Sequence, residues 1–93
     1  MIVAFDIDGT LIDNSDQPRH DVIDLFRWFE SPGHTMAIWS GGGKDYARQK
    51  ARELNLKALI YMKCSVDVDI AVDDAMETEN WGKDHKYKVV IKV

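Results

Sequence analysis

Two aspartates near the start of the chain could do chemistry together. Asp6 and Asp8 directly follow the apolar residues 1–5, and Gly9 and Thr10 come next. Side chains two residues apart on a strand point to the same side, so both carboxylates would face one way where the strand ends. At a separation of about 4 Å and an effective dielectric constant of about 20, their repulsion reaches ~4 kcal/mol. The pair therefore predicts a bound cation or a reactive site, with a solvated Asp-Gly turn as the alternative.

Two more polar groups end apolar segments further along. Ser40 and residues 41–43, all glycine, end one segment, and Asp73 and Asp74 end another. A carboxylate can attack phosphorus, and carboxylates also hold Mg²⁺, which prefers oxygen ligands. A serine and the backbone N–H groups of a glycine-rich turn suit a phosphate. These residues predict phosphoryl transfer by a covalent route, with Asp6 and Asp73 suited to the metal.

Hydrophobic spacing indicates the elements that must position these residues. A helix is predicted over residues 17–30, with Pro18 in its first turn and a Ser-Pro-Gly end. A second helix is predicted over residues 44–54, with Tyr46 on its apolar face and Asn55 as a left-handed stop. Short apolar runs predict strands over residues 2–6, 34–39, 58–61, 68–72 and 87–93.

Strands that alternate with helices indicate an α/β fold. We expect a single domain over residues 1–93: a Rossmann-like three-layer sandwich around a mainly parallel sheet of about five strands, with the last strand at an edge. Too few residues separate Thr10 from the first helix for an inserted domain, and a helix and a strand use up residues 41–62. Ligands of parallel sheets bind beyond the carboxyl ends of the strands, which would gather all three polar groups on one rim.

Residues 75–86 are the least patterned part of the chain. If this segment folds over the rim, it brings Trp81 and Tyr87 to the substrate.

The composition is that of an ordinary globular domain, with 93 residues, 45% hydrophobic and 30% charged. No apolar stretch approaches the roughly 20 residues that span a bilayer, and no signal peptide is evident, so we expect no membrane contact. The lone Cys64 cannot form an internal disulfide, which favours the cytoplasm. The net charge of −4 disfavours broad binding of a nucleic-acid backbone. Residues 44–57 are nevertheless locally basic, and this stretch is either a solvated helix face or a contact to phosphate.

These motifs resemble those of the haloacid dehalogenase-like (HAD) phosphatase superfamily. The first motif of that family, an apolar strand followed by Asp-x-Asp-Gly-Thr, matches residues 2–10. The second, an apolar strand ending in Ser or Thr, matches residues 37–41, and the fourth, paired acids after a strand, matches residues 70–74. The small size and residues 38–43 also resemble small, often phage-encoded members of the family.

The resemblance implies a Mg²⁺-dependent phosphomonoester hydrolase. Asp6 would be the nucleophile that becomes an aspartyl phosphate, and Asp8 would be the general acid and then the general base. Family dehalogenases lack the second Asp, so Asp8 argues against a dehalogenase. Mg²⁺ would be held by the Asp6 carboxylate, the Asp8 backbone carbonyl and Asp73, while Asp74 would bind through water or lock the loop.

The resemblance also implies that Thr10 orients the acids, and that Ser40 with the Gly41 N–H holds the phosphoryl group. A cation must balance the developing charge, and from the residues alone Lys44, Lys57 and Lys63 are candidates. The family's third motif is a lysine, and Lys63 is our choice for it.

Many members of the resembled family insert a cap domain after the first motif or between the second and third, and this chain has room for neither. A site without a cap would select a large phosphorylated substrate, such as a nucleic-acid end, or a smaller one enclosed by a neighbouring subunit of a homo-oligomer. One alternative is a receiver-like signalling module that is phosphorylated and binds Mg²⁺ without turnover. Receivers carry the phosphorylated Asp at the end of a middle strand, however, and residues 58–61 offer none. A scaffold that only binds metal is the third interpretation.

Overall fold

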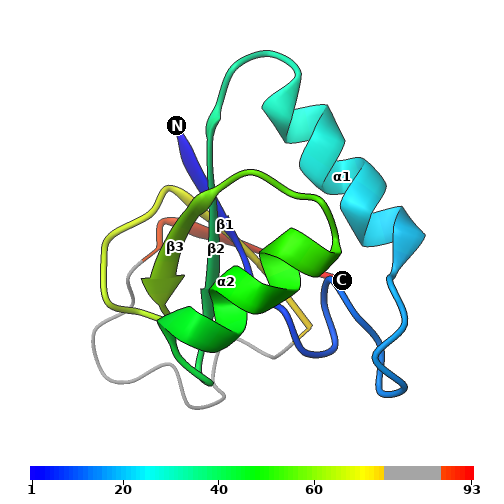
Figure 1. The fold of residues 1–93 in the computed structure, drawn as a ribbon. Coiled ribbons are helices and arrows are strands. Elements are labelled where there is room, and N and C mark those ends of the chain that lie inside the picture. Colours follow the sequence, from blue (N-terminus) through cyan, green and yellow to red (C-terminus); the bar gives the residue numbers. More distant parts are fainter. Residues whose placement is uncertain (75–86) are drawn as a thin grey trace.

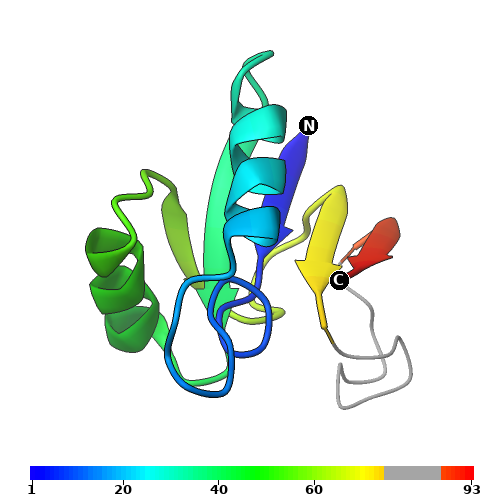
Figure 2. The same ribbon diagram turned by 90° about the vertical axis from the view of Figure 1, so that its right-hand side faces the viewer.

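The computed structural model describes residues 1–74 and 87–93, which form five strands and two helices. In chain order the elements are β1 (Ile2–Phe5), α1 (His20–Glu30), β2 (Thr35–Ser40), α2 (Lys44–Glu53), β3 (Leu59–Met62), β4 (Ile70–Asp73) and β5 (Val89–Lys92). All strand pairs are parallel, and the sheet order is β3-β2-β1-β4-β5 (Figures 1 and 2). The predicted Rossmann-like α/β fold is confirmed, and β5 lies at an edge as expected.

The first helix begins later than predicted, at His20. The cause is a tight turn that the Asp13 carboxylate closes: it accepts hydrogen bonds from the backbone N–H groups of Ser15 and Gln17, at 2.8 and 3.0 Å. Such a turn satisfies N–H groups that a helix would otherwise use. The prediction that Pro18 lies in the first helical turn is therefore wrong, because Pro18 sits in an antiparallel bridge before the helix.

Both helices cover the same face of the sheet (Figures 1 and 2). Their buried side chains pack with alternate strand residues, among them Val3 and Phe5, in the larger core cluster. The opposite face, which includes Trp39 and Ala71, packs against residues from the connection between β3 and β4, with Val68 buried there. The sheet is thus buried on both faces as predicted, but its second cover among the described residues is a loop, since this connection is too short for a helix of usual length.

The carboxyl ends of the strands meet at one rim of the sheet. The register pairs Phe5 with Val72, so Asp6 continues beside the end of β4, and the Asp6 N–H donates to the Val72 carbonyl at 3.0 Å. The Lys63 N–H donates to the Ser40 carbonyl at 3.0 Å, which ties the end of β3 to the end of β2. Four strand ends therefore converge on the region where the sequence places its polar groups.

The position of the C-terminal strand places Tyr87 away from the rim. Tyr87 is half-buried against the second face, just before the amino end of β5, and this end of a parallel strand points away from the rim. Tyr87 therefore does not reach the substrate side, and Trp81 lies outside the described residues. Neither described helix has the length and apolarity needed to cross a membrane.

Candidate active site

Three charged side chains meet where β1, β3 and β4 end. Asp6 and Asp73 are buried, at 7% and 0% exposure. Lys63 lies between them, with its Nζ 2.6 Å from Asp73 Oδ2 and 3.7 Å from Asp6 Oδ1. The other two lysine candidates, Lys44 and Lys57, are exposed, and within residues 1–74 and 87–93 neither forms an ion pair with these acids. The structure therefore brings Lys63, and not the alternatives, to the aspartates.

The cluster carries more negative charge than Lys63 can balance. Burial raises the pKa of Asp6 from 3.8 to about 7, and repulsion by Asp73 adds to this while Lys63 opposes it. Burial lowers the pKa of Lys63, but its hydrogen bond to Asp73 and the charge of Asp6 outweigh burial, so the net pKa is raised. Lys63 is thus a permanent cation, and the surplus charge on the acids favours a second cation beside it.

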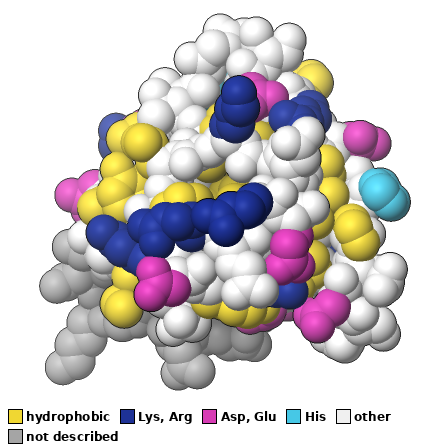
Figure 3. Space-filling view, in the orientation of Figure 1, with side chains coloured by type: hydrophobic (Ala, Val, Ile, Leu, Met, Phe, Trp, Pro, Cys, Tyr) yellow, Lys and Arg dark blue, Asp and Glu magenta, His cyan; other side chains and the backbone are white. Residues whose placement is uncertain are grey.

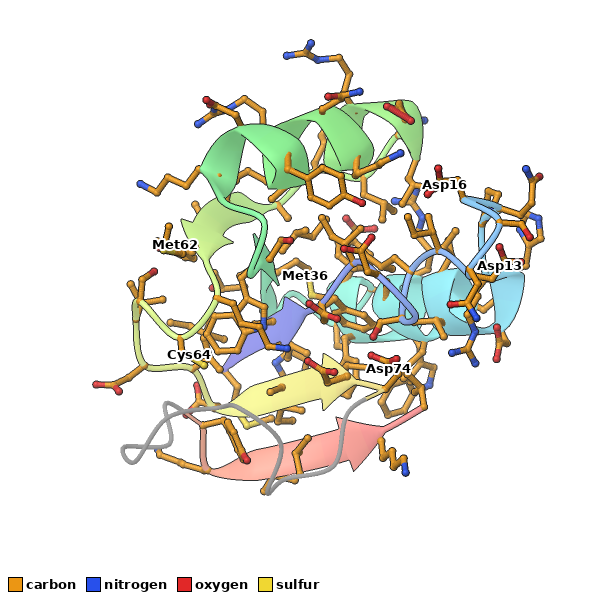
Figure 4. All side chains as sticks on the ribbon, turned by 90° about the horizontal axis from the view of Figure 1, so that it is seen from below. Asp13, Asp16, Met36, Met62, Cys64 and Asp74 are labelled. Carbon is orange, nitrogen blue, oxygen red and sulfur yellow. The ribbon has the colours of Figure 1, made fainter. Side chains whose placement is uncertain are left out.

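Asp74 joins the cluster from its exposed side, at the end of β4 (Figure 4). The buried Thr10 hydroxyl lies 3.3 Å from Asp74 Oδ1 and 3.5 Å from Asp6 Oδ2, and it accepts the Asp74 N–H at 3.1 Å. Gly9 has a φ of +78°, and a Cβ there would lie 2.1 Å from Asp74 Oδ2. Gly9 therefore leaves the space that the Asp74 carboxylate occupies, and Thr10 fastens the β1 loop to the end of β4.

Asp6, Asp73 and Asp74 could share one metal ion. Each offers a carboxylate oxygen, and the three oxygens lie within 4.8 Å of one another. An all-oxygen donor set with unbalanced negative charge fits Mg²⁺, which takes one or two carboxylates together with waters and substrate oxygens. The Asp8 carboxylate is not a member of this group.

The glycine-rich turn after β2 opens on the same rim. The buried Ser40 Oγ accepts a hydrogen bond from the Gly42 N–H at 3.0 Å, and its carbonyl accepts one from the Gly43 N–H at 3.2 Å. Gly41 is exposed between them, and α2 begins directly after the turn. Because Ser40 Oγ accepts here, its own proton can be donated to an anion.

Asp8 is exposed and contacts α2. The Tyr46 hydroxyl donates a hydrogen bond to Asp8 Oδ1 at 2.5 Å. Burial and then the hydrogen bond to Asp8 raise the pKa of Tyr46, so its hydroxyl stays protonated. The sequence placed Tyr46 on the apolar face of its helix, which is correct for the ring but misses the hydroxyl. The available signal was its place in the first turn of a helix that starts at the rim.

Arg19 is a second contact that sequence reasoning missed. Its Nη1 donates to the Gly9 carbonyl at 2.9 Å, and its Nη2 pairs with Asp21 at 3.0 Å. Arg19 therefore supports the loop that carries Asp8 and Thr10. No pattern in the sequence distinguishes it from other arginines that precede a helix.

The comparison with known families agrees with this geometry. The family of haloacid dehalogenase-like hydrolases matches residues 3–68, which include Asp6, Asp8, Ser40 and Lys63 and end before Asp73. No curated protein and no solved structure matches the chain. Since the match covers more than half of the 93 residues, the chain belongs to the haloacid dehalogenase-like hydrolases.

Proposed function

We propose that this hydrolase is a Mg²⁺-dependent phosphomonoester hydrolase that works through an aspartyl phosphate on Asp6. The observation that carries the proposal is the placement of Asp6, buried next to Lys63 and two further acids, with the exposed Asp8 two residues away. A nucleophile, a cation and an exposed carboxylate that can exchange protons are the parts that such a reaction needs.

In the first step, an oxygen of Asp6 attacks phosphorus, and the bond from phosphorus to the leaving oxygen breaks. Asp8, protonated, gives its proton to that oxygen. In the second step, Asp8 accepts a proton from a water molecule while the water oxygen attacks phosphorus and the bond from phosphorus to the Asp6 oxygen breaks, which releases phosphate and restores the Asp6 carboxylate. A Mg²⁺ ion held by Asp6, Asp73 and Asp74 would neutralise charge on the phosphoryl oxygens.

The remaining residues would hold the phosphoryl group. Lys63 is within ion-pair distance of Asp6, so it can balance charge that develops beside this side chain. Ser40 and the exposed Gly41 N–H lie on the turn at the rim, where they can donate to phosphoryl oxygens. Thr10 would hold the carboxylates of Asp6 and Asp74 in fixed positions relative to each other, since its hydroxyl lies within hydrogen-bond distance of both.

We propose that the substrate carries further negative charge in addition to the phosphate group that reacts. The described residues contain no inserted domain between Thr10 and α1 or between α2 and β3. Lys and Arg side chains form a band over α2 in the space-filling view (Figure 3). Lys44, Arg48 and Arg52 are exposed at intervals of four residues, so they share one side of the helix that starts at the rim. A phosphorylated nucleic-acid end fits this side, and a small substrate enclosed by a second subunit is the alternative.

The experiment compares wild-type protein with Asp6→Asn on an aryl phosphate in Mg²⁺. We expect no turnover by Asp6→Asn, a loss of roughly 10²–10⁴-fold for Asp8→Ala, and full activity for Asp24→Asn, which removes an exposed carboxylate on α1. Substantial turnover by Asp6→Asn would exclude the covalent route.

The receiver-like alternative is separated by the lifetime of the phosphoryl group. The exposed Asp8 beside Asp6 favours the hydrolase, because a storage module gains nothing from a proton donor at the phosphorylated residue. In a rapid-quench experiment with wild-type protein, we expect the acyl phosphate to be cleared within each turnover. Accumulation of a stable acyl phosphate would favour the signalling module.

A further inference from the structure

The hydrogen bond between Tyr46 and Asp8 joins two parts of the site that are 38 residues apart in the sequence. Asp8 lies on the loop after β1, and Tyr46 lies in the first turn of α2. Among the described residues, the Asp8 carboxylate has no other hydrogen bond. An exposed carboxylate without this contact would sample several rotamers.

The ring of Tyr46 is held on several sides, so its hydroxyl has a defined position. The ring is half-buried against the larger core cluster. A Cβ at Gly42 would lie 3.2 Å from Tyr46 Cδ2 and 3.3 Å from Ser40 Oγ, so Gly42 gives room to both side chains. Lys50 Nζ lies 5.8 Å from the ring centroid, within reach of a cation–π contact. The glycine-rich turn therefore also seats the tyrosine.

From this geometry we infer that Tyr46 is a positioning residue for Asp8. By donating to Oδ1, the hydroxyl fixes the rotamer of Asp8 and leaves Oδ2 to face the leaving-group oxygen of the substrate. The inference rests on the proposed function, because it gives Asp8 the role of proton donor. Tyr46 itself touches neither the phosphoryl group nor the nucleophile in this arrangement.

The direct test is Tyr46→Phe, which keeps the ring, its packing and its contact with Gly42 and removes only the hydroxyl. We expect kcat to fall about 10-fold, a part of the roughly 10²–10⁴-fold that general acid catalysis contributes. KM should change little, since the phosphoryl contacts remain. The matched control is Tyr61→Phe on β3, a half-buried tyrosine of the second face, which should leave both constants unchanged.

Two readouts separate positioning from a structural effect. An alkyl phosphate has a poorer leaving group than an aryl phosphate, so its hydrolysis depends more on a well-positioned proton donor. Tyr46→Phe should therefore lose more activity on an alkyl phosphate than on an aryl phosphate. In an Asp8→Ala background, Tyr46→Phe should cause no further loss. Equal losses on both substrates, or a full second loss in the Asp8→Ala background, would overturn the inference.

The same experiment distinguishes this inference from the proposed function. A wild-type protein that hydrolyses phosphate esters while Tyr46→Phe keeps full activity would overturn the role of Tyr46 alone. A correctly folded wild-type protein with no activity on either ester would overturn the proposed function, and the role of Tyr46 with it.

Discussion

Asp6→Asn should stabilise the metal-free protein while it abolishes turnover. Asp6 is buried, with 7% of the residue exposed, and burial together with the nearby Asp73 raises its pKa to about 7. The folded protein therefore has to keep a charge that its environment disfavours. Asparagine has nearly the same shape and carries no charge, so the substitution removes this cost and leaves the Lys63–Asp73 ion pair in place.

The magnitude follows from the shift in the pKa of Asp6. The rise from 3.8 to about 7 corresponds to a cost of about 4 kcal/mol for the ionised carboxylate. Because the folded pKa lies above the unfolded one, its contribution is most favourable below about pH 4 and is lost as the pH rises to about 7. We expect Asp6→Asn to exceed wild type in unfolding free energy by about 2–4 kcal/mol at pH 8 and by much less near pH 4.5.

The assay is urea unfolding of both proteins in EDTA at the two pH values. Asp24→Asn is the matched control, because it removes an exposed aspartate from the same acidic protein and corrects for the general loss of one negative charge. The reasoning is refuted if Asp6→Asn is no more stable than Asp24→Asn at pH 8. A difference that does not shrink toward acid pH would also refute it, since the cost would then not come from ionisation.

Three further predictions concern the rest of the site. Gly9→Ala should destabilise the fold by about 2–3 kcal/mol and weaken Mg²⁺ binding, because its Cβ would collide with Asp74. The control Gly33→Ala, also at positive φ but with nothing within 4 Å, should cost about 1 kcal/mol, and equal costs in thermal unfolding would contradict the contact with Asp74. Lys63→Ala should lower kcat by about 10²-fold in steady-state kinetics, and Lys57→Ala should not; the reverse result would assign the third motif to Lys57. Mg²⁺ at about 100 times its dissociation constant should stabilise the wild type by about 2.7 kcal/mol, and Asp74→Asn should lose much of this gain; melting curves that ignore Mg²⁺ would rule out the shared metal site.

Much of the fold could be predicted from local patterns. The apolar runs identify all five strands, alternation with helical spacing identifies a parallel sheet, and Asn55 ends the second helix with a φ of 57° as predicted. The Asp-x-Asp-Gly-Thr motif also indicates the family directly, because the spacing of its residues depends on one strand and one bend. These features lie within short segments, where steric preference and the period of hydrophobic residues do not depend on the rest of the chain.

Only the tertiary structure decided which distant side chains meet. From the residues alone Lys44, Lys57 and Lys63 are all candidates, and only the family resemblance favours Lys63. The pairing of β3 with β2 is what brings Lys63 to Asp6. The same applies to Tyr46, whose hydroxyl reaches Asp8 because α2 packs beside the β1 loop. Sheet order and register set these distances, and both result from the packing of the whole core and not from any single segment.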